Sequence, residues 1–176
     1  MIDALFYGVR MKLNKLILPS VAALILSGCG YTVKSSLPAS VQTVAVRVEN
    51  KTAEPAIETE VVKALQAEIQ MDGRLKLKSS DDAGAILTVT LNRYDLTPVA
   101  YDRRKGSKAR EYRVMLTARA VLSNAETGDV IAETPVVRGE TDFIYAADLT
   151  SSKLYSLPAV AEQLARKIVS VTVTAW

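Results

Sequence analysis

Apolar and polar residues alternate along several stretches of the chain, and this period of two predicts extended strands. The first predicted strand covers 41–49. A short extended segment over 74–78 leads through a turn into a longer strand over 85–96. The clearest alternation lies in 110–123, and a last strand is predicted over 130–141.

Two other stretches repeat their apolar residues at steps of three and four, which predicts amphipathic helices. The first helix is predicted to have Pro55 in its first turn and to end at Asp72, with Gly73 as its C-terminal cap. The second helix is predicted to open at Ser156, an N-cap residue, after a loop over 142–156.

The predicted order is strand, helix, strand, strand, strand, helix. It indicates an α+β fold, a two-layer sandwich in which a mostly antiparallel four-stranded sheet carries both helices on one face. Turn residues over 124–129 predict a hairpin before the last strand, and Pro135 predicts an edge position or a bulge within it. Strict alternation puts Arg93 on the face of Leu91. The other sheet face is either solvated or covered in part by a partner.

The first 28 residues have the pattern of a secretory signal. A short positive segment precedes an apolar run over 16–26, and Leu26-Ser27-Gly28-Cys29 has the form of a lipobox. The run is shorter than the roughly 20 residues that a membrane-spanning helix needs. A simple anchor helix, or a buried helix that ends in a chance cysteine, is the alternative. We expect cleavage before Cys29 and lipidation of its sulfur and amine.

Processing at the lipobox divides the chain into a signal peptide over 1–28, a lipidated polar tether over 29–40 and a single domain over 41–176. Attached acyl chains hold a protein on a membrane at about 0.8 kcal/mol per buried methylene. Gly30 stands where lipoproteins retained in the inner membrane carry Asp, so we expect the outer membrane, on its periplasmic side. Met11 opens a complete signal pattern, and we hypothesise that translation starts there.

The composition excludes several classes of chemistry. The chain has no histidine and one cysteine, which rules out Ser-His-Asp and Cys-His catalysis, histidine metal sites and an internal disulfide. Carboxylate pairs at Glu58/Glu60 and Asp81/Asp82 are interpreted as solvated, and no phosphate-binding glycine loop occurs. We therefore expect neither an enzyme nor a cofactor. Part of the formal charge of +3 lies in the leader, so we expect no nucleic-acid partner.

One cluster of basic residues stands out, in and beside a polar loop predicted over 97–109. Such a cluster holds phosphate groups through charge-assisted hydrogen bonds, and the alternative is a solvated hairpin tip. The chain's scattered tyrosines are interpreted mostly as anchors of the core or of loops. The candidate phosphate-binding residues are Arg103, Arg104, Lys105, Lys108 and Arg110.

A series of short segments follows in a distinctive order over nearly the whole mature chain. They are Cys29-Gly30-Tyr31, Leu37-Pro38, Val44-Ala45-Val46, Asn50-Lys51-Thr52, Glu54-Pro55, Asp72-Gly73-Arg74-Leu75, Ala83 with Ala85-Ile86-Leu87, Pro98-Val99-Ala100-Tyr101-Asp102, Glu111-Tyr112-Arg113-Val114, Thr127-Gly128 and the ending over 169–176. Each segment alone is unspecific, but the ordered set resembles the LPS-assembly lipoprotein (LptE) family.

This resemblance implies a lipoprotein in the outer membrane of Gram-negative bacteria. It implies a partner, the LptD β-barrel, which the lipoprotein plugs and helps to assemble so that lipopolysaccharide reaches the outer leaflet. Such a protein binds and positions rather than catalyses. The family pattern assigns no residue in the basic loop. The alternative function is that of a scaffold subunit of another cell-envelope or secretion complex, and the partner distinguishes the two.

Overall fold

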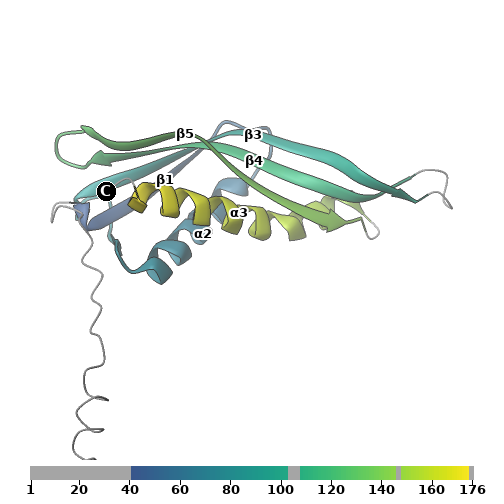
Figure 1. Ribbon diagram of the computed structural model, residues 1–176, viewed down its shortest axis with the longest axis horizontal. Helices are drawn as coiled ribbons and strands as arrows, with labels where there is room; N and C mark the ends of the chain where they lie inside the picture. Colours follow the sequence, from purple (N-terminus) through teal and green to yellow (C-terminus); the bar gives the residue numbers. More distant parts are fainter. Residues whose placement is uncertain (1–40, 103–107, 146–147, 175–176) are drawn as a thin grey trace, which may run out of the picture. The chain divides into compact units, whose positions relative to one another are not determined.

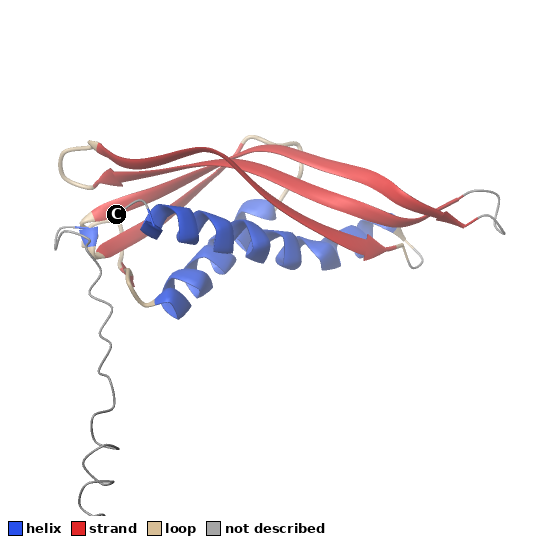
Figure 2. Ribbon diagram, in the orientation of Figure 1, coloured by secondary structure: helices blue, strands red, loops and turns tan. Residues whose placement is uncertain are grey.

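The computed structural model describes residues 41–102, 108–145 and 148–174, and the signal and tether predicted over 1–40 lie outside them. Figure 1 shows both helices on the same side of the sheet, and Figure 2 shows the resulting two layers. The elements are β1 (Thr43–Asn50), α2 (Ile57–Asp72), β2 (Lys76–Leu77), β3 (Ala85–Asp102), β4 (Lys108–Asn124), β5 (Val130–Ile144) and α3 (Leu149–Thr174).

The α+β sandwich is confirmed, but the sheet is five-stranded and mixed, with the order β2-β1-β3-β4-β5. The prediction of four strands was wrong in number, and two of the pairings, β1 with β2 and β1 with β3, are parallel, while the longer pairings are antiparallel as predicted. Lys76–Leu77 is too short to show a period, yet it adds to the edge as β2. Because α2 carries the chain back across the sheet, β1 runs parallel to β3. Alternation in a sequence does not specify the direction in which strands pair.

The three C-terminal strands are longer than predicted. β3 continues to Asp102 and β4 begins at Lys108, so most of the predicted loop over 97–109 is strand. The loop predicted over 142–156 is also mostly structured, because β5 reaches Ile144 and α3 begins at Leu149. Polar residues on exposed strand faces had made these segments look like loops.

The core faces predicted for β4 and α2 are confirmed. The inward residues of β4 are Val114, Leu116, Ala118, Ala120 and Leu122, and each is at most 2% exposed. They pack with the apolar stripe of α2 in one core that also contains α3. The stripe of α2 consists of Ile57, Val61, Ala64, Leu65 and Ile69.

Two irregularities decide which side chains face outward. A register shift between Leu91 and Arg93 turns Arg93 to the exposed face, so its predicted inward position was wrong. The same shift brings Tyr94 to the inner side, packed against the core. The second shift lies where β4 pairs with β5 around Pro135. Both predicted roles of Pro135 hold, since β5 is an edge strand and bears a bulge there.

The helix termini were predicted with mixed success. Gly73 caps α2 in a left-handed conformation and donates its N–H to the Ile69 carbonyl at 3.1 Å, as predicted. Pro55 lies before α2 rather than in its first turn, and Ala56 takes the left-handed N-cap position. Within the described residues, no helix is long and apolar enough to cross a membrane.

Candidate functional site

The candidate phosphate-binding residues surround the connection between β3 and β4. These two strands stay paired as far as Asp102 and Lys108. In Figure 1 the resulting hairpin runs on past the helices, at the end opposite to the β4–β5 turn. β3 and β4 therefore form a long two-stranded projection, and the basic segment lies in and beside the connection between these strands.

The five basic residues divide into two groups. Arg103, Arg104 and Lys105 lie outside the described residues. Lys108 and Arg110 both lie in β4, although Lys108 had been placed in the predicted loop, and Arg110 is exposed. The hairpin brings the ends of this basic segment together, but the structure does not describe how the five side chains meet.

The end of β5 lies directly beside Arg110. The Tyr145 N–H donates to the Arg110 carbonyl at 2.8 Å, and Ile144 pairs with Glu111. Ile144 is an apolar side chain on a free edge, and it is 62% exposed. A basic side chain and an exposed apolar one therefore lie on neighbouring strands.

Aromatic rings gather at the same end of the sheet. Tyr112 stacks on Phe143 with 5.8 Å between ring centroids, and Tyr145 lies tilted against Tyr112 at 6.4 Å. Pairs of this kind contribute about 0.5–1.5 kcal/mol beyond their buried area. They join β4 to β5 where the helical layer ends.

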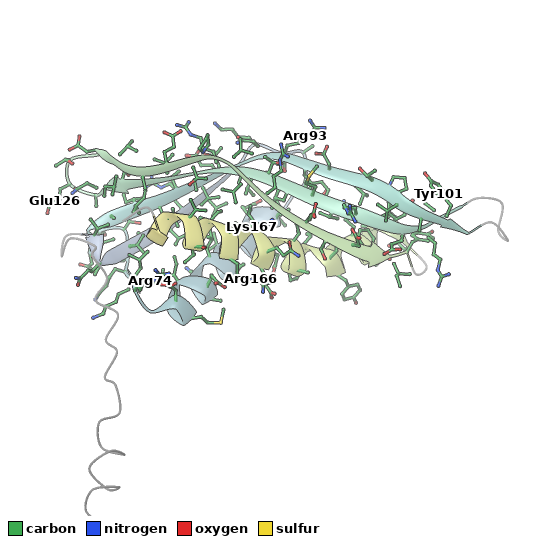
Figure 3. The ribbon with its side chains drawn as sticks, in the orientation of Figure 1. Arg74, Arg93, Tyr101, Glu126, Arg166 and Lys167 are labelled. Carbon is green, nitrogen blue, oxygen red and sulfur yellow. The ribbon has the colours of Figure 1, made fainter. Side chains whose placement is uncertain are left out.

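A groove of about 270 Å³ separates the end of β5 from the start of α3. Tyr155 lines it and is 86% exposed, while Tyr101 on β3 is 57% exposed at the hairpin (Figure 3). The prediction that the tyrosines serve mostly as anchors fails for these two. We call Tyr101, Arg110, Ile144 and Tyr155 the tip surface. It includes three exposed apolar or aromatic side chains and one basic side chain, and the residue that pairs directly with Ile144 is Glu111.

Asp148 fixes the start of α3 beside this groove. Its carboxylate accepts the Ser151 N–H at 2.7 Å, and the Ser152 hydroxyl donates to its carbonyl. Hydrogen bonds from Ser151 lower the pKa of Asp148. The predicted N-cap at Ser156 was wrong, because Ser156 lies inside the helix and bonds the Lys153 carbonyl.

A buried polar cluster ties α3 to the rest of the domain. The Lys153 ammonium lies 2.9 Å from the Glu54 carboxylate, and both side chains are mostly buried. The Tyr94 hydroxyl is buried and has no hydrogen-bond partner among the described residues. Burial, and secondarily the Glu54 charge, raise the pKa of Tyr94. This cluster stabilises the junction between the β1–α2 connection and α3.

The motif around Asn50 has a structural role as well. The Asn50 amide donates to the Glu54 carbonyl at 2.8 Å and to the Glu58 carboxylate at 2.9 Å. Its side-chain oxygen accepts the Thr52 N–H at 2.9 Å. Asn50 thus shapes the loop that presents Glu54 to Lys153.

The outer sheet face neutralises its own charge. Its arginines pair with carboxylates at 2.7–2.8 Å, and the Arg113 hydrogen bond lowers the pKa of Asp142. Exposed pairs of this kind add little stability, but they neutralise the arginines that take part in them. This geometry favours a solvated face. The pairs are Arg93–Asp95, Arg113–Asp142 and Arg119–Glu133.

The carboxylate pairs noted in the sequence have ordinary partners. Glu58 accepts from Asn50, Glu60 pairs with Lys63 at 2.8 Å, and Asp82 accepts from Ser79. In the part of the chain that the structure describes, no group of three metal-ligating side chains occurs.

Sequence reasoning missed the apolar half of the tip surface. Ile144 and Tyr155 were placed in a predicted loop. An isolated apolar residue in a loop does not indicate a binding surface, because single exposed apolar residues are common. The signal available in the sequence was the pair of adjacent apolar residues, Leu154 and Tyr155, just before Ser156. In the structure both are exposed on the first turns of α3.

Comparison with known proteins gives a family. The model described as "LptE: Lipopolysaccharide-assembly" matches residues 41–171. No curated protein matches the chain.

Several solved structures share the fold at low identity. A lipoprotein from Caulobacter crescentus has 14% identity and a TM-score of 0.51, covering 73% of this chain and 88% of its own. A minor lipoprotein from Acinetobacter baumannii has 13% identity and a TM-score of 0.52, with coverages of 77% and 94%. The PelC dodecamer from Paraburkholderia phytofirmans has 15% identity and a TM-score of 0.50, with coverages of 78% and 93%. At these identities the likeness establishes the fold alone.

Proposed function

The chain belongs to the LptE lipopolysaccharide-assembly family, and from this premise we propose that it is an outer-membrane lipoprotein that partners and plugs an LptD-type β-barrel. In this function it is anchored through lipid on Cys29, on the periplasmic side, and assists the assembly of lipopolysaccharide at the outer membrane. The family is one of assembly proteins rather than enzymes. The observation that carries the proposal is the family match, which spans 41–171.

The tip surface supports a role in contacting lipopolysaccharide. Lipopolysaccharide presents phosphate groups next to acyl chains, so a complementary surface combines cations with apolar and aromatic side chains. The hairpin places Arg110 beside Tyr145, near the aromatic pair of Tyr112 and Phe143, and the exposed Ile144 is the neighbouring residue at the end of β5. We assign phosphate binding to Arg103, Arg104, Lys105, Lys108 and Arg110.

The partner is tested by affinity purification of the lipidated protein from detergent-solubilised outer membranes, followed by mass spectrometry. We expect a stoichiometric LptD-like barrel. Recovery of the lipoprotein alone, or with an unrelated envelope complex, would move the function to a scaffold subunit of another machine. The same spectra report whether the N-terminal peptide carries lipid on Cys29, so anchoring and partnership are measured separately.

The phosphate site is tested by replacing Arg103, Arg104 and Lys105 together with Ala. Hydrogen bonds to charged groups contribute about 1.5–3 kcal/mol, and solvent screening reduces this, so we expect binding of purified lipopolysaccharide to weaken about tenfold. Salt dependence should flatten, because fewer charges interact.

A matched control removes equal charge elsewhere, by replacing Lys51, Lys76 and Lys78 with Ala. All three are exposed and lie away from the hairpin tip. We expect this variant to bind like the wild type. Wild-type binding at low salt by the tip variant would discard the basic segment as a site.

A further inference from the structure

A second, larger groove lies between β5 and the C-terminal half of α3. Its volume is about 800 Å³. Val136 and Val171 stand on its two sides and are 56% and 44% exposed, while Val137 beneath is buried. Isolated exposed valines are ordinary on a surface, but here they line one continuous trough.

Three basic residues line this trough, and no carboxylate residue is among the described residues that line it. The cations are Arg138 on β5 and Arg166 and Lys167 on α3, the last two labelled in Figure 3. None of them forms an ion pair with a described residue, unlike the arginines of the outer face. The groove therefore has an excess of basic residues, although Arg166 also borders a smaller pocket that contains Glu68 and Glu162.

A hydrogen bond to the backbone of β5 holds Lys167 at the mouth of the groove. Its ammonium donates to the Arg138 carbonyl at 2.7 Å. An ammonium has three N–H donors, so two stay available for an anion. Because the bonded carbonyl belongs to Arg138, this contact joins α3 to the edge of β5 at that residue.

The edge of β5 is poorly suited to an added peptide strand. Lys167 occupies the Arg138 carbonyl, and Gln163 accepts the Glu140 N–H at 3.4 Å. Pro135 has no N–H to offer. These features are common ways of protecting a sheet edge. The groove thus presents apolar side chains and cations rather than a row of free backbone groups, which favours an anionic amphiphile over a peptide.

The groove lies toward the end of the domain where the tether arrives. β1 starts beside Ala85, Ala85 pairs with Asn124, and β5 starts just beyond the following turn. The chain from Cys29 to Val41 spans at most about 40 Å when extended. A lipid anchor on Cys29 would therefore keep this end, and not the hairpin tip, within reach of the leaflet that holds it.

We propose that this groove binds an anionic phospholipid of that leaflet, with the phosphate on Arg138, Arg166 and Lys167 and part of one acyl chain along Val136 and Val171. Guanidinium and ammonium groups form charge-assisted hydrogen bonds with phosphate oxygens. The inference rests on the anchoring part of the proposed function, and it adds a second contact with the membrane that is separate from lipopolysaccharide binding at the tip.

The test uses the full lipidated protein in liposomes that contain phosphatidylglycerol with a photoreactive group in one acyl chain. After illumination, mass spectrometry locates the lipid adducts. We expect them at 134–138 and 166–171. Reversal of the three cations with Arg138→Glu, Arg166→Glu and Lys167→Glu should lower the adduct yield about tenfold, since each basic residue near an anionic surface contributes about 1 kcal/mol. Photoreactive phosphatidylcholine should give few adducts with either protein.

Two further variants keep the result interpretable. Arg138→Gln with Arg166→Gln leaves the Lys167 contact intact, so a smaller loss is expected without a change in folding. Lys51→Glu, Lys76→Glu and Lys78→Glu reverse equal charge, and two of these lysines lie on or beside β2, next to the start of β1. This control should keep wild-type adducts if the groove, and not general attraction to the membrane, holds the lipid.

Adducts absent from the groove, or unchanged in the triple reversal, would overturn the proposal. Absence of lipid adducts in the groove, together with a dimer of the lipidated protein, would assign the groove to a second copy instead. Failure here leaves the barrel partnership untouched, because that is measured by co-purification. Absence of lipid on Cys29 would be seen in the same spectra and would remove the membrane premise itself.

Discussion

Gly139 in β5 provides a direct test of how closely the two layers pack. It is buried and pairs with Leu116 on β4. A Cβ at this position would lie 2.6 Å from the Val160 carbonyl oxygen and 2.9 Å from the Leu164 amide nitrogen. Both atoms belong to the backbone of α3, so no side-chain rotation relieves the clash, and the helix itself must move away from the sheet.

The substitution Gly139→Ala should therefore be strongly destabilising. Overpacking a tight core costs about 1–3 kcal/mol. Because two backbone atoms are in contact here, we expect a loss of about 3 kcal/mol in the free energy of unfolding. For a domain of this size, that loss lowers Tm by roughly 10 °C. Urea titration and thermal melting, both followed by circular dichroism, measure it.

Gly128→Ala is the matched control, because Gly128 has a φ of 77° with open space where a Cβ would lie. Its cost is the left-handed conformation alone, about 1–2 kcal/mol. Gly139→Ala should exceed it, and Gly139→Ser should be at least as harmful. A Gly139→Ala protein as stable as Gly128→Ala would refute the close contact between β5 and α3.

Two smaller predictions concern the junction around α3. Tyr94→Phe removes a buried hydroxyl that has no hydrogen-bond partner among the described residues, so it should raise the free energy of unfolding by about 1 kcal/mol. A lower free energy of unfolding on urea titration would mean that the hydroxyl has a hydrogen-bond partner, for example a bound water. Hydrogen bonds with Ser151 lower the pKa of Asp148 in the folded protein. The stability that Asp148 contributes is therefore present above its unfolded pKa of about 3.9. It is lost as the pH falls through the lower folded pKa. Stability profiles from pH 6 to pH 2 should therefore be flatter for Asp148→Asn, and superimposable profiles would contradict this capping role.

Local patterns in the sequence predicted most of the individual elements. The α2 stripe, the Gly73 cap and the inward face of β4 follow from periods that a single element must satisfy on its own. The edge or bulge role of Pro135 follows from its missing N–H. The basic segment was also visible, because charge is a property of residues and needs no partner to be seen.

The sequence alone, then, determined where apolar faces lie, which catalytic chemistries the residue set excludes, and which family the ordered motifs resemble. The tertiary structure decided what depends on pairing between distant segments. These decisions include the parallel pairing of β1 with β3, the outward turn of Arg93 at a register shift, and the lengths of the strands on either side of the tip. It also brought Val136 and Val171 together with three cations in one groove. The physical reason is that periodicity indicates only which side of an element is apolar. Strand direction, register and grooves arise when elements that are distant in the sequence pack against one another.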